Sequence, residues 1–176
     1  MKNIIFITGP CRSGKSKFAV KIAKENFKNV VFIATGKEID DEMKERIEKH
    51  KKTRPKEWKT VEENIDIENF IESGNDYIID CITTWITNLM LKNYGEKEII
   101  NKVKNLIIKI RKEKCCAIIV SNEVGWGIVP ENKIARDFRD IIGKVHQLIS
   151  ENSDYVYLIV SGIPLKLKGE KNNGVF

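Results

Sequence analysis

The sequence predicts a three-layer α/β fold with a mostly parallel central sheet, and three observations support that prediction. Five short apolar runs rich in β-branched residues lack any alternation of polar and apolar positions, as is typical of strands buried on both faces. Segments with helical spacing of apolar residues separate these runs, as expected where helices cover a parallel sheet. The chain has 176 residues, which suits one domain over residues 1–176 with a full hydrophobic core.

The expected strands alternate with helices along the chain. They are Ile4–Thr8, Val30–Ala34, Tyr77–Asp80, Ala117–Ser121 and Val156–Ser161. The first helix is expected from Lys17 onward, where the apolar residues of Phe18–Ala23 share one face. Two further apolar stripes, Val103–Ile110 and Ile134–Ile149, predict helices before and after the fourth strand. Right-handed crossovers would join the parallel strands.

Residues 37–64 do not fit the pattern of a core, because charged residues dominate there. Ile39, Met43 and Ile47 are spaced by four, which predicts an amphipathic helix in part of the segment. That helix is expected to break at Arg54–Pro55, since the residue before a proline disfavours the α conformation. We therefore interpret the segment as an excursion from the sheet that reaches over a ligand site.

Charge and cysteine content restrict the classes of protein that fit the chain. The 31 Lys and Arg residues exceed the 25 Asp and Glu residues and give a net charge of +6. The two signs are interleaved, so we expect polyphosphate substrates and no nucleic-acid partner. We also expect no secretory leader and no membrane partner, because no apolar run is long enough. The four cysteines form no C-x-x-C pair, which indicates reduced thiols in a cytoplasmic protein. The basic stretch 166–176 is expected to fray.

A glycine-rich segment joins the first expected strand to the first expected helix. Its residues are Gly9, Pro10, Cys11, Arg12, Ser13, Gly14, Lys15 and Ser16, which match the P-loop pattern G-x-x-x-x-G-K-[ST]. The two glycines permit backbone angles that turn successive N–H groups inward, and the helix N-terminus adds its positive end. Lys15 can reach the outer phosphates of a nucleoside triphosphate, and Ser16 can offer its hydroxyl to Mg²⁺. The segment predicts a protein that binds a nucleoside triphosphate and moves phosphoryl or nucleotidyl groups.

A P-loop also needs an acid on a second strand, to hold the metal ion or its waters. Asp80 ends the expected strand Tyr77–Asp80. It is the candidate second ligand of Mg²⁺ beside Ser16, directly or through water. A carboxylate at a strand end can also serve only as a cap, an alternative that the residue alone leaves open.

Several longer segments carry a resemblance that covers nearly the whole chain. They are RIEKHKKTRP at 46–55, DCITTWITN at 80–88, SNEVGWGIVPEN at 121–132, ARDFRD at 135–140 and VSGIPLK at 160–166. In this order they resemble the bifunctional adenosylcobinamide kinase / adenosylcobinamide-phosphate guanylyltransferase family of cobalamin biosynthesis. The most specific pieces are H-x-x-x-R-P, which begins at His50, and N-E-V-G-x-G-I-V-P-E-N. Asp80 stands where some members have Glu, and Pro10 contributes no N–H to the loop.

The resemblance implies two activities. The family phosphorylates the hydroxyl of the aminopropanol arm of adenosylcobinamide with ATP or GTP. It then transfers GMP from GTP to that phosphate through a GMP–histidine intermediate, giving adenosyl-GDP-cobinamide and pyrophosphate. His50 matches the histidine. The family's nucleotide contacts match Gly9–Ser16, Ala34, Thr35, Gly36, Lys51, Lys52, Thr53, Arg54, Glu62 and Asp80. The family also implies a RecA-like fold and a homotrimer.

The surroundings of His50 suit a nucleophile, although a histidine among charges is often only a solvated surface residue. Its neighbours include Lys49, Lys51, Lys52 and Arg54. Nearby positive charges disfavour the imidazolium, and attack on phosphorus requires the neutral ring. The same cations can stabilise charge on the α-phosphate and on the leaving pyrophosphate. His146, in the expected third helix, is assigned no role.

Other side chains leave two interpretations open. Arg54 can clamp a phosphate through two hydrogen bonds or lie on the surface before a turn. Glu62 can accept hydrogen bonds from guanine or ribose, or be a solvated carboxylate. Glu123 follows an expected strand, at the sheet edge where ligands bind, and can orient the substrate hydroxyl or hold the turn at Gly125–Gly127. The tryptophans, which can stack on a ligand or pack in the core, are Trp58, Trp85 and Trp126.

Two other functions compete with the bifunctional one. A P-loop small-molecule kinase without guanylyl transfer would carry no covalent nucleotide and would not need His50. A nucleotide-dependent switch or RecA-like DNA-binding module would hydrolyse slowly, and its DNA binding would weaken steeply with salt. The chain lacks the interleaved aromatic and basic residues of a groove for single-stranded DNA.

Overall fold

A seven-stranded sheet forms the centre of the computed structural model, which describes residues 3–36 and 54–169. The strands are β1 (Ile4–Thr8), β2 (Val30–Ala34), β3 (Lys59–Glu62), β4 (Asp76–Asp80), β5 (Ala117–Val120), β6 (Tyr155–Val160) and β7 (Ile163–Lys168). Their order across the sheet is β3-β2-β4-β5-β1-β6-β7. All neighbours pair in parallel except β6 and β7, which form an antiparallel hairpin. The predicted mostly parallel sheet is confirmed.

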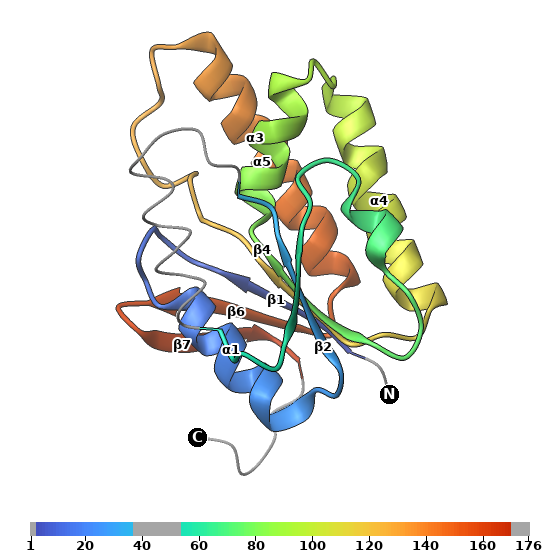
Figure 1. Ribbon diagram of the computed structural model, residues 1–176. Helices are drawn as coiled ribbons and strands as arrows, with labels where there is room; N and C mark the ends of the chain where they lie inside the picture. Colours follow the sequence, from blue (N-terminus) through green and yellow to red (C-terminus); the bar gives the residue numbers. More distant parts are fainter. Residues whose placement is uncertain (1–2, 37–53, 170–176) are drawn as a thin grey trace.

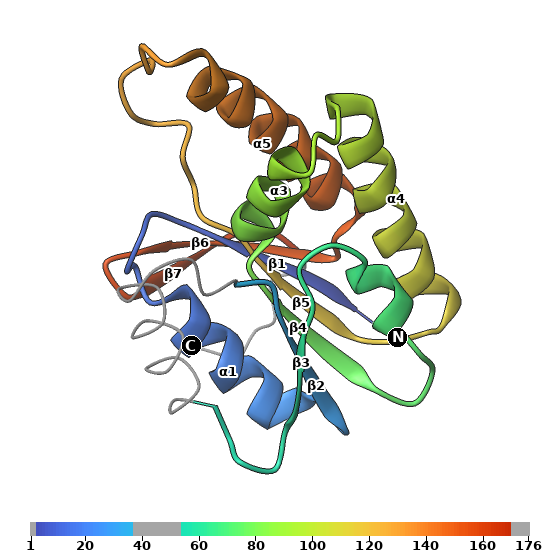
Figure 2. The same cartoon turned by 45° about the horizontal axis from the view of Figure 1, so that its top comes forward.

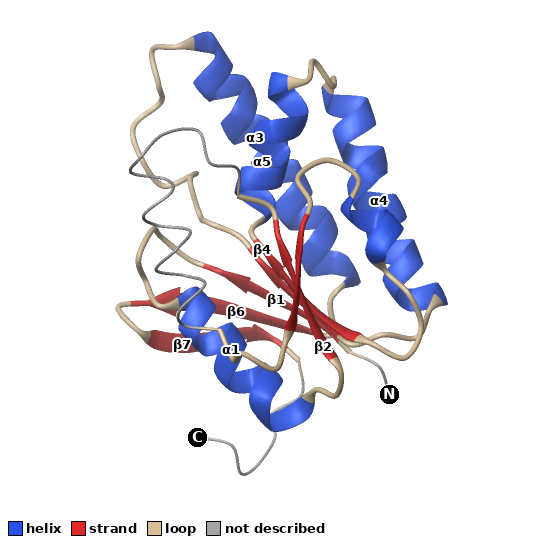
Figure 3. Ribbon diagram, in the orientation of Figure 1, coloured by secondary structure: helices blue, strands red, loops and turns tan. Residues whose placement is uncertain are grey.

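Helices cover both faces of this sheet (Figure 1). They are α1 (Lys15–Asn26), α3 (Ile82–Leu91), α4 (Glu96–Lys112) and α5 (Lys133–Asn152), with a short 3-10 helix, η1 (Ile67–Phe70). Helix α1 lies against one face, and α3, α4 and α5 lie together against the other (Figure 2). The three layers of helix, sheet and helix are separated by colour in Figure 3.

The residues of β1 divide between two cores, because successive side chains of a strand point to opposite faces. Ile4 and Phe6 belong to the larger core, under α3, α4 and α5. Ile5 and Ile7 belong to the smaller core, under α1. All four residues are at most 9% exposed. Strand β1 is therefore buried on both faces, and its first four residues, Ile4–Ile7, are all apolar, which explains a run without alternation in the sequence.

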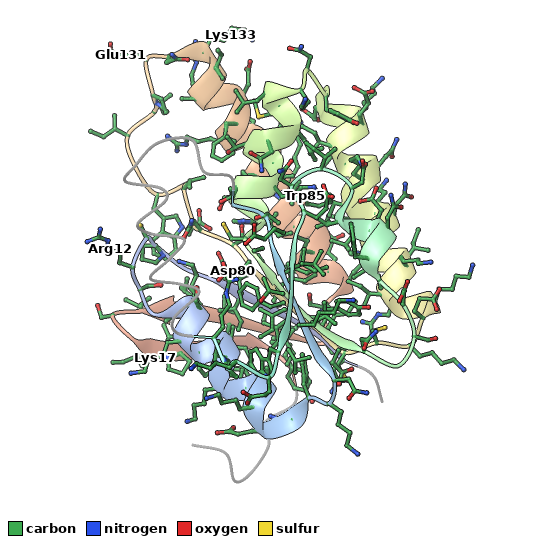
Figure 4. The ribbon with its side chains drawn as sticks, in the orientation of Figure 1. Arg12, Lys17, Asp80, Trp85, Glu131 and Lys133 are labelled. Atoms are coloured by element: carbon green, nitrogen blue, oxygen red, sulfur yellow. The ribbon has the colours of Figure 1, made fainter. Side chains whose placement is uncertain are left out.

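Trp85 anchors α3 in the larger core (Figure 4). Its side chain is fully buried, and its indole Nε1 donates a hydrogen bond to the carbonyl of Ile65 at 2.9 Å. Of the two interpretations open for the tryptophans, packing describes this one. Trp58 is half-buried, whereas Trp126 is exposed.

Two edge strands and one helix differ from the sequence-based expectation. Strand β3 lies inside the expected excursion 37–64, so the chain returns to the sheet before residue 64. The sequence shows no sign of this strand, because its one apolar residue is the partly buried Val61. Strand β7 extends to Lys168, within the stretch expected to fray, and Pro164 and its lysines are typical of an edge. Helix α3 was not expected, although Ile82, Trp85, Ile86 and Leu89 lie at helical spacing on one face of this ten-residue helix. Ile134, placed in the α5 stripe, is 70% exposed.

None of the helices in the described part of the chain has the length and apolar character needed to cross a membrane.

Candidate functional site

The P-loop connects β1 to α1 at the carboxyl end of the parallel strands. Gly9 has φ of 149° and Gly14 has φ of 100°, values that L side chains rarely adopt. A Cβ atom at Gly9 would lie 2.4 Å from the carbonyl oxygen of Ile159 in β6. The loop thus needs glycine at its first position both for its backbone angle and for the close approach of β6. Arg12 points outward from the loop (Figure 4).

The turn between β6 and β7 supports the loop from the other side. The N–H of Gly162 donates to the carbonyl of Ser13 at 2.9 Å, and the N–H of Ser13 donates to the carbonyl of Pro10 at 3.3 Å. Lys15 is 6% exposed, and its Nζ donates to the carbonyl of Pro10 at 2.7 Å. Burial lowers the pKa of Lys15, while the nearby Asp80 carboxylate opposes that shift. A polyphosphate at the loop would supply the negative charge that this buried ammonium needs.

Ser16, in α1, and Asp80, at the end of β4, are joined by a hydrogen bond at the carboxyl edge of the sheet. The Ser16 hydroxyl, in the first turn of α1, donates to Oδ2 of Asp80, at the end of β4, over 2.7 Å. This pair of hard oxygen donors fits Mg²⁺, which takes one or two protein ligands and completes its shell with water and phosphate oxygens. Among the described residues, no group of three or more His, Cys, Asp and Glu side chains could hold a metal ion instead.

The segment Ala34–Gly36 continues β2 into this edge of the sheet. Thr35 is fully buried; its hydroxyl donates to the carbonyl of Cys81 at 2.8 Å and accepts from the N–H of Cys81 at 2.9 Å. Asn88, from α3, donates its amide to the carbonyl of Thr35 at 2.9 Å. Thr35 therefore joins the end of β2 to the residue after Asp80, and it fixes the carboxylate relative to β2.

Arg54 and Glu62 belong to a second feature, a cavity of about 290 Å³ beside β3. Its lining residues are Arg54, Pro55, Lys56, Trp58, Thr60 and Glu62. The Arg54 guanidinium lies 3.9 Å above the ring of Phe32, and its Nε and Nη1 have no hydrogen-bond partner within the described residues. Burial lowers the pKa of Arg54, opposed first by Asp80 and then by Glu62. Both carboxylates therefore interact electrostatically with Arg54. Since Asp80 contacts the P-loop and Glu62 lines the cavity, Arg54 lies between the charges of the two features.

The structure thus brings together most of the nucleotide-binding residues expected from the sequence: the P-loop, Ala34–Gly36, Arg54, Glu62 and Asp80. The expected nucleophile, His50, and the expected contacts Lys51, Lys52 and Thr53 lie outside the described residues.

A buried polar group that the sequence analysis did not use lies behind the same edge. His146, on the inner face of α5, is 9% exposed, and its Nε2 lies 2.7 Å from the hydroxyl of Ser121. Its Nδ1 lies 3.6 Å from Oε2 of Glu123. The sequence could have indicated that His146 is buried, because it lies in the apolar stripe of α5 between Val145 and Ile149.

Two arginines of α5 hold the loop that connects β5 to α5. Arg139 donates to the carbonyls of Gly125 and Ile128, both at 2.7 Å. Arg136 donates to the carbonyl of Pro130 at 2.9 Å. The loop extends away from the sheet, with Glu131 near its outer tip (Figure 4). It is consequently ordered by side-chain bonds, although Trp126 is 73% exposed and Ile128 is 95% exposed.

The parallel sheet, the P-loop after its central strand and the acid at the end of β4 define the class of protein: a P-loop nucleotide-dependent enzyme with a RecA-like fold. Within this class, the chain belongs to the family described as cobinamide kinase / cobinamide phosphate guanyltransferase, whose sequence profile matches residues 5–167.

Relatives of known name agree with this family. The chain is 38% identical to the bifunctional adenosylcobalamin biosynthesis protein CobU of Escherichia coli (strain K12), over 94% of this chain and 99% of that protein. It is 37% identical to the bifunctional adenosylcobalamin biosynthesis protein CobP of Pseudomonas aeruginosa, over 93% and 96%. Among solved structures, a KaiC-like protein from Pyrococcus horikoshii superposes with a TM-score of 0.54 at 16% identity, over 97% of this chain and 81% of that one. The last similarity concerns the fold alone.

Proposed function

We propose that this protein phosphorylates adenosylcobinamide with ATP or GTP and then transfers GMP from GTP to adenosylcobinamide phosphate. The observation that carries the proposal is the meeting of the P-loop with Asp80 in a chain of the cobinamide kinase / cobinamide phosphate guanyltransferase family. The proposal includes Mg²⁺ as the cofactor, a homotrimer as the assembly and the cytoplasm as the location.

The kinase step depends on positioning and on charge. The inward backbone of the P-loop and the N-terminus of α1 would bind the β- and γ-phosphates. Lys15 would leave the carbonyl of Pro10 and donate to the outer phosphates. Ser16 and Asp80 would hold Mg²⁺, which supplies charge neutralisation at the phosphate oxygens when bound. Phosphoryl transfer requires little covalent participation by the protein, so these electrostatic contacts would supply most of the rate enhancement of the kinase step.

The guanylyl transfer uses a nucleophile and a second set of nucleotide contacts. We assign the nucleophile to His50, which would attack the α-phosphate of GTP as pyrophosphate leaves. Arg54 suits a phosphate contact, because two of its guanidinium nitrogens have no partner among the residues described. Glu62 and Trp58 line the adjoining cavity and suit a guanine or ribose, the carboxylate as an acceptor and the indole as a stacking surface. Lys51, Lys52 and Thr53 complete the proposed contacts.

The test is covalent labelling. The purified protein is incubated with Mg²⁺ and GTP labelled at the α-phosphate, denatured, and examined for label held on the chain. Wild type and the surface control Gln147→Ala should carry acid-labile, base-stable label, and His50→Ala should carry none while still binding GTP. Absence of label on wild type, with GTP binding demonstrated, would refute the histidine mechanism and leave a P-loop kinase without guanylyl transfer.

A further inference from the structure

Glu123 lies at the point of the sheet edge where the two halves of the phosphate site meet. Strand β5 runs between β1, which leads into the P-loop, and β4, which ends at Asp80. Val120, at the end of β5, is in register with Ile7 on one side and with Asp80 on the other. Glu123 follows it by three residues, and its N–H donates to the carbonyl of Gly9 at 2.9 Å. Its backbone is therefore fixed directly to the first residue of the P-loop.

The carboxylate of Glu123 is held at one oxygen and faces a histidine with the other. Oε1 accepts from the N–H of Gly125 at 2.7 Å, and Oε2 lies 3.6 Å from Nδ1 of His146. The side chain is 19% exposed, so a substrate can reach it. Each carboxylate oxygen has two acceptor positions, so these contacts leave capacity for a further donor.

His146 is placed and oriented to face that carboxylate. Its ring lies against Phe6, with centroids 5.3 Å apart, and its Nε2 lies 2.7 Å from the Ser121 hydroxyl. If Ser121 donates to Nε2, the proton of the neutral ring is on Nδ1 and faces Glu123. Burial lowers the pKa of His146, and the Glu123 carboxylate, the one charged group acting on it among the described residues, opposes that shift. The lowered pKa keeps the ring neutral at pH 7, and with Ser121 as the donor to Nε2 the ring proton lies on Nδ1, on the side of Glu123.

We propose that Glu123 accepts the proton of the substrate hydroxyl during phosphorylation, and that His146, itself held by Ser121, positions the Glu123 carboxylate. This inference rests on the kinase half of the proposed function. The hydroxyl oxygen forms a bond to the γ-phosphorus while the bond between that phosphorus and the β–γ bridging oxygen breaks. The electron pair of the breaking bond stays on the bridging oxygen and leaves with the nucleoside diphosphate. The hydroxyl proton passes to the Glu123 carboxylate and then to solvent after the product departs. Glu123 is the catalytic residue, and His146 is a positioning residue.

A purely structural role for Glu123 makes a different prediction. The bond from Gly125 holds the turn after β5, and a glutamine would keep that bond through its amide oxygen. Glu123→Gln therefore removes the proton acceptor while it preserves the turn. The matched control is Glu131→Gln, the same substitution at an exposed carboxylate near the tip of the same loop (Figure 4).

The experiment measures the two half-reactions separately on the full chain. Phosphorylation is followed with γ-labelled ATP and adenosylcobinamide, and guanylyl transfer is followed with GTP and supplied adenosylcobinamide phosphate. We expect Glu123→Gln to lower kcat of phosphorylation by about 100-fold or more, with guanylyl transfer and Tm close to wild type. We expect Glu131→Gln to match wild type in both reactions.

Variants of His146 test the positioning role. His146→Leu should lower kcat of phosphorylation with little change in KM, because the Glu123 carboxylate loses the ring that faces it. His146→Asn, whose amide can replace Nδ1–H, should recover part of that rate. If Glu123→Gln phosphorylates the substrate at the wild-type rate, or if both half-reactions fall equally, the inference about Glu123 is wrong, while the proposed kinase function still stands. A wild-type protein without kinase activity would refute the proposed kinase function itself.

Discussion

The hydroxyl of Ser16 donates to the carboxylate of Asp80 over 2.7 Å, although the two residues are 64 positions apart in the chain. One belongs to the first turn of α1 and the other to the last position of β4, so the contact exists only when the sheet is assembled. Burial of Lys15 close to this pair lowers the pKa of the lysine. The Lys15 ammonium and the Asp80 carboxylate offset each other's charge, so a bound Mg²⁺ would add positive charge that anionic phosphates would balance.

Replacement of Asp80 tests the metal site. Asp80→Asn should keep a hydrogen bond with Ser16 through the amide oxygen but lose the negative charge that Mg²⁺ requires. We expect kcat of phosphorylation to fall by about 100-fold or more, and the Mg²⁺ dependence of nucleotide affinity to weaken. Calorimetric titration with ATP, with and without Mg²⁺, measures the second effect. An unchanged Mg²⁺ dependence would contradict the assignment of Asp80 as a metal ligand.

Replacement of Gly9 tests the fit between the P-loop and β6. The Cβ of alanine would lie 2.4 Å from the backbone oxygen of Ile159, in a backbone conformation that is strained for alanine. We expect Gly9→Ala to lower the free energy of unfolding by about 2–4 kcal/mol, as measured in urea, and to weaken nucleotide binding. The control is Gly143→Ala on the exposed face of α5, where no atom lies within 4 Å of the new Cβ; there we expect a gain of about 0.5–1 kcal/mol.

Burial of His146 predicts a pH dependence of stability. Burial lowers the pKa of His146 in the folded protein below the ordinary value of 6.5, so between these two values the unfolded chain binds more protons. The stability is therefore complete above pH 6.5 and is lost as pH falls from 6.5 towards the folded-state value. Urea unfolding at pH 7.5 and 5.5 should show a larger loss for wild type than for His146→Leu, which cannot titrate at that position. Equal losses in the two proteins would contradict the buried neutral ring.

The sequence predicts the central strands well because they are buried on both faces. Ile4–Thr8 and Val30–Ala34 match β1 and β2 at both ends, since every position of these strands is buried and all but Thr8 are apolar. Edge strands carry no such signal. Strand β3 has a single apolar residue, and β7 alternates apolar residues with proline and lysine. Pairing with a neighbour, rather than burial, places these two strands in the sheet, and pairing is invisible in a single sequence.

The sequence likewise predicts one part of the candidate site, the part that depends on consecutive residues, and misses the part that depends on long-range contacts. The P-loop and Asp80 follow from local patterns, because a strand, a turn and a helix are read from consecutive residues. The hydrogen bonds of Thr35 with Cys81 and the approach of His146 to Glu123 join segments far apart in the chain. His146 offered a partial signal, since a polar ring in an apolar stripe requires a buried partner. Its partners Ser121 and Glu123 could be identified only after α5 was placed against β5.

The close packing of Gly9 on β6 has a consequence for synthesis on the ribosome. Strand β1 is translated before both of its neighbours in the sheet, β5 and β6, and Ile4 pairs with Ala117. The bond from Gly162 to Ser13 requires the β6–β7 hairpin as well. The P-loop of the nascent chain therefore lacks these contacts until β5 and the β6–β7 hairpin have been translated. A prematurely terminated chain that lacks the hairpin would have neither the pairing of β1 with β6 nor the bond from Gly162 to Ser13, and its P-loop would be braced on one side only.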